Sequence, residues 1–497
     1  MRMRSLLAAA AAGGIVMTGL AAPGEAAVRD GTISGTAAAP AWAGAIPLPG
    51  LSALDRGQPA DPEALSCAAA GDCAIGGSYT DAAGRTQAFV AAERSGVWGA
   101  ATEVPGSAAL NRGGNAVVTS VSCPAPGDCA AVGQYSPGGQ AAGGTGAPSA
   151  AAFVVVERNG AWGAATPLRG LAARNKGRSA GAARVSCWSP GDCTVVGTYA
   201  AGARGRDLIT QAFVAGERNG VWGAAVPLPG LVSLNTAGQA QVTALSCAPA
   251  RAGVHGTTAA RRAAAGDCAV GGKYGDRAGT EAFTADEVRG AWHRAREFPG
   301  TAARNTAGAA GISALSCPVA GDCAVAGSYA YKTGHGSESG TGFVADSRAW
   351  KWSAPHAVPG TGDVVSCGSP GNCEAGGTSF PDRGSGAFIA DETRGTWAGP
   401  RSVPGLAGPG ADVIAISCPS AGECAAGGSA SPRRGAPDQA FVVTEHGGRW
   451  SGAHQAPSGG AGDSAVTLMS CASPLACTAA GYDDNGGGVF VMSTSPR

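Results

Sequence analysis

Cysteine is the residue type with the clearest chemical potential in this 497-residue sequence, because its sixteen copies fall into eight local pairs. Seven pairs have five residues between their members, and the fourth is lengthened by an insertion from Pro249 to Ala265. Zinc sites favour about two to four residues between cysteine ligands and a second convergent pair or histidines. We therefore predict eight structural disulfides, which join Cys67 to Cys73, Cys123 to Cys129, Cys187 to Cys193, Cys247 to Cys268, Cys317 to Cys323, Cys367 to Cys373, Cys418 to Cys424 and Cys471 to Cys477.

Histidines and acidic residues offer little further chemistry. No two of the six histidines have a ligand spacing, and the run from Asp483 to Gly486 lacks the spaced ligands and closing glutamate of a calcium loop. No Gly-x-Ser-x-Gly elbow stands in a strand-to-helix context, and no convincing helix is found. We predict no catalytic residue, no metal site and no cofactor.

A glutamate precedes a hairpin turn in six of the repeated units. A catalytic carboxylate pair should occur once rather than six times. We interpret these residues as solvated carboxylates at strand ends, near an arginine in several units: Glu93, Glu157, Glu217, Glu287, Glu392 and Glu445.

The cysteine pairs mark a repeat of 50 to 70 residues, in which a phenylalanine follows each pair and a tryptophan usually follows nine residues later. One unit contains four strand-like runs, residues 117–122, 129–135, 152–157 and 161–163. Asn159-Gly160 between the last two predicts a type I′ hairpin turn. Four short strands in about 50 residues are typical of a β-propeller blade.

The position of Trp42 predicts how the ring closes. The last unit supplies Cys471, Cys477 and Phe490 but no tryptophan, whereas Trp42 precedes the first cysteine pair and has no phenylalanine of its own. We predict an all-β fold, an eight-bladed β-propeller of four-stranded antiparallel blades, closed by an N-terminal outer strand, with one disulfide per blade. Residues 28–497 form one domain in this prediction, and residues from about 38 to 50 complete blade 8.

The first 27 residues have the order of a secretory signal peptide. Arg2 and Arg4 precede an apolar run from Leu6 to Ala22, and small residues follow up to Ala27. The alternative is a membrane anchor, for which this run of alanine and glycine is short. We predict a secreted, extracellular protein in a compartment that permits disulfides.

Charge excludes some partners. The 35 basic and 35 acidic residues balance, so neither nucleic acid nor an anionic membrane has a basic surface to bind. The 83 glycines and 31 prolines approach the level of disordered chains, but in this repeat they fall at turns and beside inner strands. We expect a monomer.

The units resemble kelch-type propeller blades. The segment from Ser66 to Tyr79, followed by Trp98 and Pro105, carries the likeness, and four units have the double glycine of kelch. More closely, the units resemble the Ser-Cys…Cys-x-x-x-Gly repeats of secreted propeller proteins in high-GC Gram-positive bacteria. The resemblance implies architecture only. The ligands of the galactose oxidase copper site are not found, and the turn from Glu93 to Trp98 lacks the aspartate of a sialidase Asp box.

Binding is expected on one face of the ring. The disulfide hairpins and Asn-Gly turns make one face uniform, and the other face carries loops of variable length, which is where binding residues concentrate. A polar motif recurs there in the connections into the first five blades. It is interpreted either as loops held by their own Asn or Asp side chains or as a binding crescent of Asp55, Arg56, Asn111, Arg112, Asn175, Lys176, Asn235 and Asn305.

The most direct functional prediction is a secreted, non-catalytic propeller that binds an extracellular glycan or protein. The alternative is a carbohydrate-active propeller enzyme, a hydrolase or lyase, with acids, Tyr or Arg converging at the central channel. A third class is a purely structural envelope protein.

Overall fold

The computed structural model describes residues 41–56, 60–139, 141, 148–249, 266–334, 337–379, 386–406, 410–456, 462–484 and 488–495. All of them belong to one compact unit, residues 39–497. The predicted signal peptide lies outside the described residues, and so do His255, His335, residues 250–265 of the insertion, and Asn485 and Gly486.

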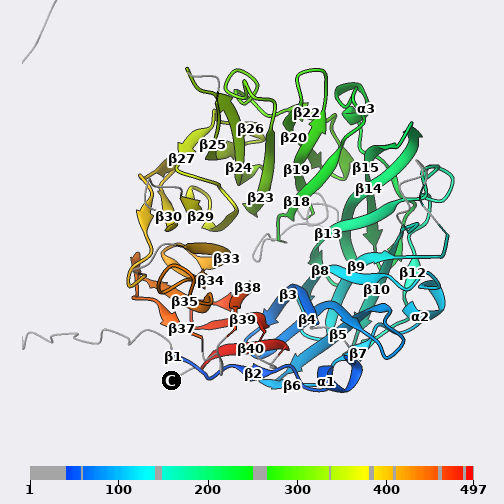
Figure 1. Cartoon of the computed structure of the whole chain (residues 1–497), viewed down its shortest axis with the longest axis horizontal. Helices are drawn as coiled ribbons and strands as arrows, with labels where there is room; N and C mark the ends of the chain where they lie inside the picture. The colour runs from blue at the N-terminus through cyan, green and yellow to red at the C-terminus, as the bar shows by residue number, and fades with distance from the viewer. Residues whose placement is uncertain are drawn as a thin grey trace, which may run out of the picture. The chain divides into compact units, whose positions relative to one another are not determined.

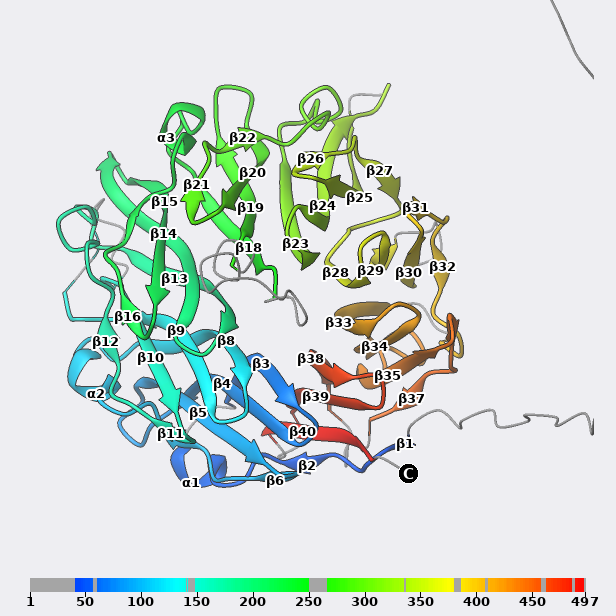
Figure 2. The ribbon, with the colours of Figure 1, turned by 180° about the vertical axis from the view of Figure 1, so that it is seen from behind.

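Eight antiparallel sheets stand around a ring, each with its first strand nearest the centre (Figures 1 and 2). In each sheet three long strands are neighbours in chain order. The fourth strand is split into two short segments that both pair with the third strand, so each blade is four strands wide. This confirms the eight-bladed, all-β propeller.

The first four blades have the following bounds. Blade 1 contains β3 (Asp61–Ala69), β4 (Asp72–Thr80), β5 (Thr86–Arg94), β6 (Val97–Trp98) and β7 (Thr102–Glu103). Blade 2 contains β8 (Ala116–Ala125), β9 (Asp128–Tyr135), β10 (Ala151–Arg158), β11 (Ala161–Trp162) and β12 (Thr166–Pro167). Blade 3 contains β13 (Ala180–Ser189), β14 (Asp192–Arg204), β15 (Asp207–Arg218), β16 (Val221–Trp222) and β17 (Val226–Pro227). Blade 4 contains β18 (Gln241–Cys247), β19 (Cys268–Gly275), β20 (Thr280–Val288), β21 (Ala291–Trp292) and β22 (Arg296–Glu297).

The other four blades complete the ring. Blade 5 contains β23 (Ala310–Val319), β24 (Asp322–Lys332), β25 (Glu338–Arg348), β26 (Lys351–Trp352) and β27 (His356–Val358). Blade 6 contains β28 (Val364–Ser369), β29 (Asn372–Ser379), β30 (Gly386–Thr393), β31 (Thr396–Trp397) and β32 (Arg401–Ser402). Blade 7 contains β33 (Ala411–Ser420), β34 (Glu423–Ala430), β35 (Gln439–His446), β36 (Arg449–Trp450) and β37 (His454–Gln455). Blade 8 contains β38 (Ser464–Ser473), β39 (Ala476–Asp483), β40 (Gly488–Ser495), β1 (Ala41–Trp42) and β2 (Ile46–Pro47).

Blade 8 is closed by strands from both ends of the ring-forming unit. β1 pairs with β40, with Ala41 opposite Ser495 and Trp42 opposite Thr494, and the two strands lie side by side in Figure 1. β2 continues the same edge and places Ile46 opposite Val491. Trp42 packs against the core of blade 8. The predicted closure by an N-terminal outer strand is therefore confirmed.

A buried phenylalanine and a glycine opposite it explain the repeated pattern within each blade. In blade 2, Phe153 on β10 faces Gly133 on β9, and Phe153 is fully buried. A methyl group on Gly133 would overlap the carbonyl oxygen of Val117 and lie 2.9 Å from the Phe153 ring. The glycine therefore gives the ring its space and lets the first strand approach the second.

The hairpin turns between the third and fourth strands have the predicted geometry. Asn159 and Gly160 have φ angles of 49° and 80°, which is the pair of positive values that a type I′ turn requires. The connections contain three four-residue helices, which the sequence did not predict: α1 (Leu51–Leu54), α2 (Ser107–Leu110) and α3 (Leu231–Leu234). None of the helices in the described part of the chain has the length and apolarity needed to cross a bilayer.

All eight predicted disulfides are formed, one in each blade. Each joins the first strand to the second near the hairpin that connects them.

The serine before each first cysteine links neighbouring blades. Its hydroxyl accepts a hydrogen bond of 2.9 or 3.0 Å from the backbone N–H of the first cysteine of the next blade. The eight bonds form a closed circle, which we call the Ser–Cys circle: Cys123 to Ser66, Cys187 to Ser122, Cys247 to Ser186, Cys317 to Ser246, Cys367 to Ser316, Cys418 to Ser366, Cys471 to Ser417 and Cys67 to Ser470.

Candidate functional site

The six recurring glutamates are buried between blades, so their interpretation as solvated carboxylates is wrong. Each is 1 to 5% exposed, and each lies near the end of the third strand of its blade. The next residue along the strand is an arginine in blades 1, 2 and 3. Because neighbouring residues of a strand point to opposite faces, the glutamate faces one adjacent blade and the arginine faces the other.

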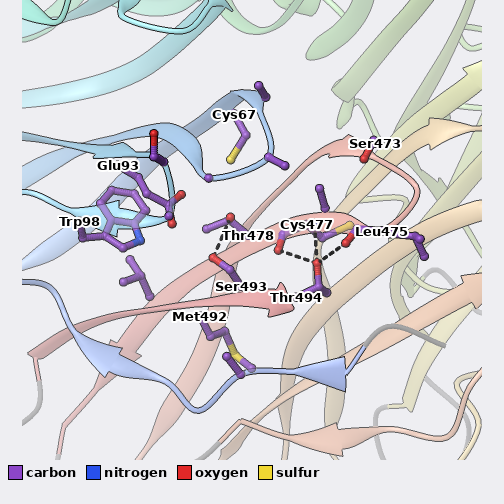
Figure 3. Close-up of a pocket in the computed structure, with 18 of the residues that line it drawn as sticks. Cys67, Glu93, Trp98, Ser473, Leu475, Cys477, Thr478, Met492, Ser493 and Thr494 are labelled. Carbon is purple, nitrogen blue, oxygen red and sulfur yellow. Dashed lines mark hydrogen bonds between the residues drawn. The ribbon is translucent and has the colours of Figure 1, made fainter. Parts of the chain in front are cut away.

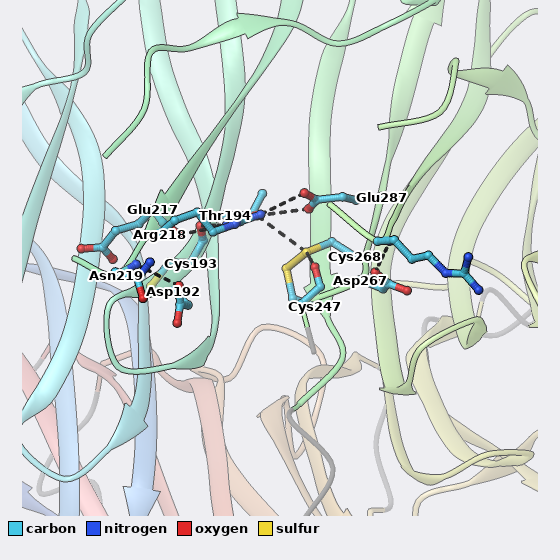
Figure 4. A network of polar contacts seen from close by, with 12 residues as sticks. Asp192, Cys193, Thr194, Glu217, Arg218, Asn219, Cys247, Asp267, Cys268 and Glu287 are labelled. Carbon is cyan, nitrogen blue, oxygen red and sulfur yellow. Dashed lines mark hydrogen bonds and ion pairs between the residues drawn. A yellow bond between two sulfur atoms is a disulfide. The ribbon is translucent and has the colours of Figure 1, made fainter. Parts of the chain in front are cut away.

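At three junctions this arrangement forms an ion pair. Arg94 of blade 1 pairs with Glu157 of blade 2. Arg158 pairs with Glu217 at 2.8 Å. Arg218 pairs with Glu287 at 3.0 Å (Figure 4). Burial raises the pKa of each of these three glutamates, and its arginine partner opposes that rise. The arginines therefore compensate a repeated buried charge.

At two junctions other residues replace both the arginine and the glutamate. Between blades 4 and 5 the arginine position is Val288 and the glutamate position is Ser347. The Ser347 hydroxyl instead accepts from Cys323 N–H and donates to the Gly321 carbonyl, both at 3.0 Å. Between blades 7 and 8 the two positions are His446 and Thr494, and Thr494 makes the corresponding bonds in its own hairpin.

Two glutamates keep their position although the preceding blade has no arginine to offer. Glu445 follows a blade whose corresponding residue is Thr393, and Glu93 follows a blade whose corresponding residue is Ser495. At the remaining junction Arg348 lowers the pKa of Glu392, but burial and Asp346 raise it to about 7. Glu93 and Glu445 are therefore the exceptions in the series.

A groove of about 560 Å³ lies next to Glu93, at the junction of blades 8 and 1; we call it the 8/1 groove (Figure 3). Its lining is mostly apolar and includes Trp98, Met492, Ile46 and Leu475. Ile46 and Leu475 are 49 and 44% exposed, whereas Trp98 is 9% exposed. The groove therefore has an exposed apolar rim and a buried aromatic wall, with a volume typical of small-ligand sites.

The Glu93 carboxylate is the charged group of the 8/1 groove. It lies beside Trp98 in Figure 3 and belongs to the groove lining. Its Oε2 is buried and has no hydrogen-bond partner among the residues that the structure describes. Burial raises the pKa of Glu93, and the nearby Asp72 raises it further. An occupant with a positive charge would be stabilised there.

The predicted binding crescent is held largely by its own asparagine side chains. Asn111, Asn235 and Asn305 are 1, 3 and 5% exposed. The Asn111 amide donates to the Thr86 carbonyl of blade 1, and its oxygen accepts from Asn115 N–H. Asn175, Asn235 and Asn305 repeat this pattern. These contacts are the ones expected if the Asn side chains hold their own loops.

The other members of the crescent lie closer to solvent. Arg56, Arg112 and Lys176 are exposed, and Asp55 is half-buried. None of the eight crescent residues lines the 8/1 groove or a second hollow of about 780 Å³ between blades 5 and 6. Ligand binding by the crescent stays a prediction.

The innermost strands bring some charged residues together. Asp61 and Glu63 lie on β3, and Arg184 lies on β13. Desolvation by the surrounding strands raises the pKa of Glu63, the charge of Asp61 raises it further, and the charge of Arg184 opposes the rise. These residues belong to the region where the enzymatic alternative placed its site.

A repeated Glu-Arg dipeptide is the sequence signal for the ion pairs. Glu93-Arg94, Glu157-Arg158 and Glu217-Arg218 recur at the same position of three units. Strand alternation sends the two side chains of each pair to different neighbouring blades. The groove had no such signal, because its lining comes from strands at opposite ends of the sequence.

The similarities to known proteins are too weak to carry an argument. No protein-family model and no curated protein matches the chain. Among solved structures, a Hadza microbial sialidase is similar at 12% identity and a TM-score of 0.34, over 70% of this chain and 73% of that one. The β-propeller domain of the trilobed protease of Pyrococcus furiosus is similar at 8% identity and a TM-score of 0.37, over 81% of this chain and 99% of that one. A post-proline cleaving enzyme from Rickettsia typhi is similar at 8% identity and a TM-score of 0.39, over 83% of this chain and 56% of that one. These likenesses carry no argument about activity.

The ion-pair series predicts a pH-dependent stability loss in Arg158→Met. Without its cation, Glu217 has a higher pKa in the folded state than in the unfolded state. The loss of folding stability is then absent below the ordinary glutamate pKa, where Glu217 is protonated in both states. It grows as the pH rises toward the pKa of Glu217 in the folded state. Because the Arg158 side chain is 41% exposed, we expect a loss of only about 1–2 kcal/mol at pH 8 and little loss at pH 4.

Urea unfolding at both pH values measures this loss. The exposed Arg169, which belongs to no ion pair in the part of the chain that the structure describes, supplies the control Arg169→Met. The double variant Arg158→Met with Glu217→Gln should recover most of the loss at pH 8. An equal loss at both pH values would contradict the electrostatic explanation.

Proposed function

We propose that this protein is a secreted, non-catalytic binding propeller that holds an arginine-bearing segment of an extracellular protein partner in the 8/1 groove. The observation that carries the proposal is the buried carboxylate of Glu93, whose Oε2 has no hydrogen-bond partner among the described residues, at a groove that is mostly apolar. The predicted signal peptide and the eight disulfides support an oxidising, extracellular setting.

Charge complementarity favours arginine as the occupant. At three equivalent junctions an arginine of the preceding blade forms an ion pair with the glutamate that corresponds to Glu93. At the junction of blades 8 and 1 that position is Ser495, and the Glu93 carboxylate has no such cation in the described chain. A partner's guanidinium would supply the missing half of the ion pair, and its fork of donors matches a carboxylate.

The apolar lining favours a protein segment over a sugar. Ile46 and Leu475 at the rim and Met492 in the lining would contact the aliphatic stem of the arginine and apolar neighbours in the segment. Exposed apolar residues around a pocket are typical of sites that bind other proteins. The groove is on the face of the disulfide hairpins, whereas the sequence favoured the opposite, loop-bearing face.

Short peptides test the proposal directly. We expect a fluorescent peptide with one arginine between leucines to bind, and its citrulline counterpart, which lacks the charge, to bind about tenfold more weakly. Fluorescence anisotropy measures both dissociation constants. In Glu93→Gln the two peptides should bind equally weakly, because the carboxylate is gone.

Matched variants separate the possible occupants. Glu338→Gln removes an exposed acid from the second hollow, between blades 5 and 6, and should leave peptide binding to the 8/1 groove unchanged. Equal binding of both peptides to the unaltered protein would sink the arginine assignment, and binding only of glycans on an array would replace it with the sugar alternative. If the peptide binds only after the substitution Arg497→Ala, the groove would be assigned to the chain's own Arg497, which would compete with the peptide.

A further inference from the structure

The junction of blades 6 and 7 gathers three carboxyl groups from three strands. Glu374 on β29 and Asp391 on β30 are direct cross-strand partners. Glu445 on β35 of the next blade places a carboxyl oxygen within 4.8 Å of an oxygen of Glu374. Glu374 and Glu445 are 6 and 5% exposed. We call these three residues the 6/7 cluster.

Two substitutions in the repeat create the 6/7 cluster. The position of Glu374 is alanine or threonine in the seven other blades: Ala74, Ala130, Thr194, Ala269, Ala324, Ala425 and Thr478. The residue that would offer an arginine to Glu445 is Thr393. Blade 6 therefore adds one acid and removes one base at the same junction.

The charges around the 6/7 cluster do not balance the three acids. Arg401 on β32 forms an ion pair with Asp391. From blade 7, Glu423 adds a further acid near Glu445, and His446 bonds to Glu423 rather than to the cluster. One arginine thus faces three carboxyl groups, and a further cation would relieve their repulsion.

Two carboxyl groups of the 6/7 cluster, those of Glu374 and Glu445, are close enough to share an ion. One oxygen of Glu374, one of Glu445 and the Cys424 sulfur all lie within 4.8 Å of one another. Cys424 is in a disulfide, so the oxygens are the ligands on offer. Glu374 Oε2, Glu445 Oε2 and Asp391 Oδ1 are buried and have no hydrogen-bond partner among the described residues.

We propose that the 6/7 cluster binds one Ca²⁺ ion, with Glu374 and Glu445 as ligands from two adjacent blades and Asp391 beside them. Carboxylate oxygens are the ligands that hard divalent cations take, and Ca²⁺ tolerates an irregular ligand set better than Mg²⁺ does. The ion would join blades 6 and 7 at the place where an Arg–Glu pair joins other blades. The sequence had predicted no metal site, because it contains no calcium-loop motif.

Thermal unfolding of the whole protein after treatment with a chelator tests the proposal. Extracellular calcium sites have dissociation constants of about 0.1–1 mM. At about 10 mM CaCl₂ and pH 7.5 we expect Tm to rise by about 3 °C for a chain of this size. Native mass spectrometry should show one added Ca²⁺ per chain.

Two variants locate the ion. Thr393→Arg should supply Glu445 with the arginine of the other junctions, and Glu374→Ala gives blade 6 the residue of its neighbours. Both should lose the Ca²⁺-dependent rise in Tm while remaining folded in chelator, and Glu338→Ala, far from the cluster in the sequence and on another blade, should keep it.

Other outcomes would overturn the proposal. An unchanged Tm with Ca²⁺, Mn²⁺ and Mg²⁺ would exclude a cation and leave a shared proton as the compensation. A rise that persists in both Thr393→Arg and Glu374→Ala would place the ion elsewhere. A larger rise with Mg²⁺ than with Ca²⁺ would exclude calcium as the preferred ion.

Discussion

Deletion of residues 41–47 is expected to destabilise the ring by about 5 kcal/mol or more. The deletion removes Trp42 from the core of blade 8 and takes away both strand segments that pair with β40. Trp42 is partly buried, so its loss alone costs less than that of a fully buried aromatic, about 3–5 kcal/mol, and the loss of strand pairing adds to it. The exposed edge of β40 would also be free to pair with other molecules. Differential scanning calorimetry measures the loss, and size-exclusion chromatography measures association.

Two further variants make this expectation specific. Deletion of residues 28–34, which lie outside the described part of the chain, should leave Tm unchanged. Trp42→Ala should reproduce a large share of the loss while keeping the backbone of β1. A deletion variant that melts like the intact protein would show that blade 8 does not depend on its fourth strand.

Gly133→Ala is expected to cost about 3 kcal/mol, although it adds one methyl group to a strand. The new carbon would overlap the Val117 carbonyl oxygen and press on the Phe153 ring. Backbone on one side and a fully buried ring on the other leave little room to adjust, so the strain is at the upper end of overpacking effects. Urea unfolding measures the change in the free energy of unfolding.

Gly340→Ala is the matched control, because Gly340 also lies in a strand, β25, and no atom comes within 4 Å of an added carbon. We expect it to be neutral or slightly stabilising. Gly481→Ala in blade 8 should repeat the Gly133 result, since it would overlap the Ala465 carbonyl and lie 2.9 Å from Phe490. Equal effects at Gly133 and Gly340 would contradict the packing explanation.

The architecture was predictable because its determinants repeat. Cysteine pairs, phenylalanines and tryptophans return at one register in successive units, and the displaced Trp42 had a single vacant position in the last unit. Short-range rules were sufficient for the hairpins, since Asn159-Gly160 specifies its own turn. Each of these signals depends on residues close in sequence or on their periodic return.

The sites were harder to predict because they depend on departures from the repeat. Ser495, Thr393 and Glu374 are ordinary residues when read alone, and their meaning comes from what the other blades carry at the same register. Acids at strand ends are usually exposed to solvent, which is why the sequence predicts solvated carboxylates for the recurring glutamates. Only the packing of adjacent blades shows that their carboxyl groups are enclosed.

The asparagines of the connections illustrate the opposite case. Their exposed loop context and polar neighbours suggested a binding crescent, but the Asn111 and Asn305 amides reach back to the preceding blade. A side chain of this length can satisfy both its donor and its acceptor within a loop, and sequence spacing alone does not distinguish that arrangement from a free binding group.

The Ser–Cys circle has a consequence for how such a protein can change in length. Every unit brings one backbone donor, on its first cysteine, and one hydroxyl acceptor, on the serine before it. Unequal recombination that adds or removes an entire repeat would therefore leave every remaining donor matched with an acceptor, so this bonding pattern is indifferent to blade number. Exchange of a single blade between two such proteins should likewise preserve the circle, which makes individual blades reasonable units for grafting.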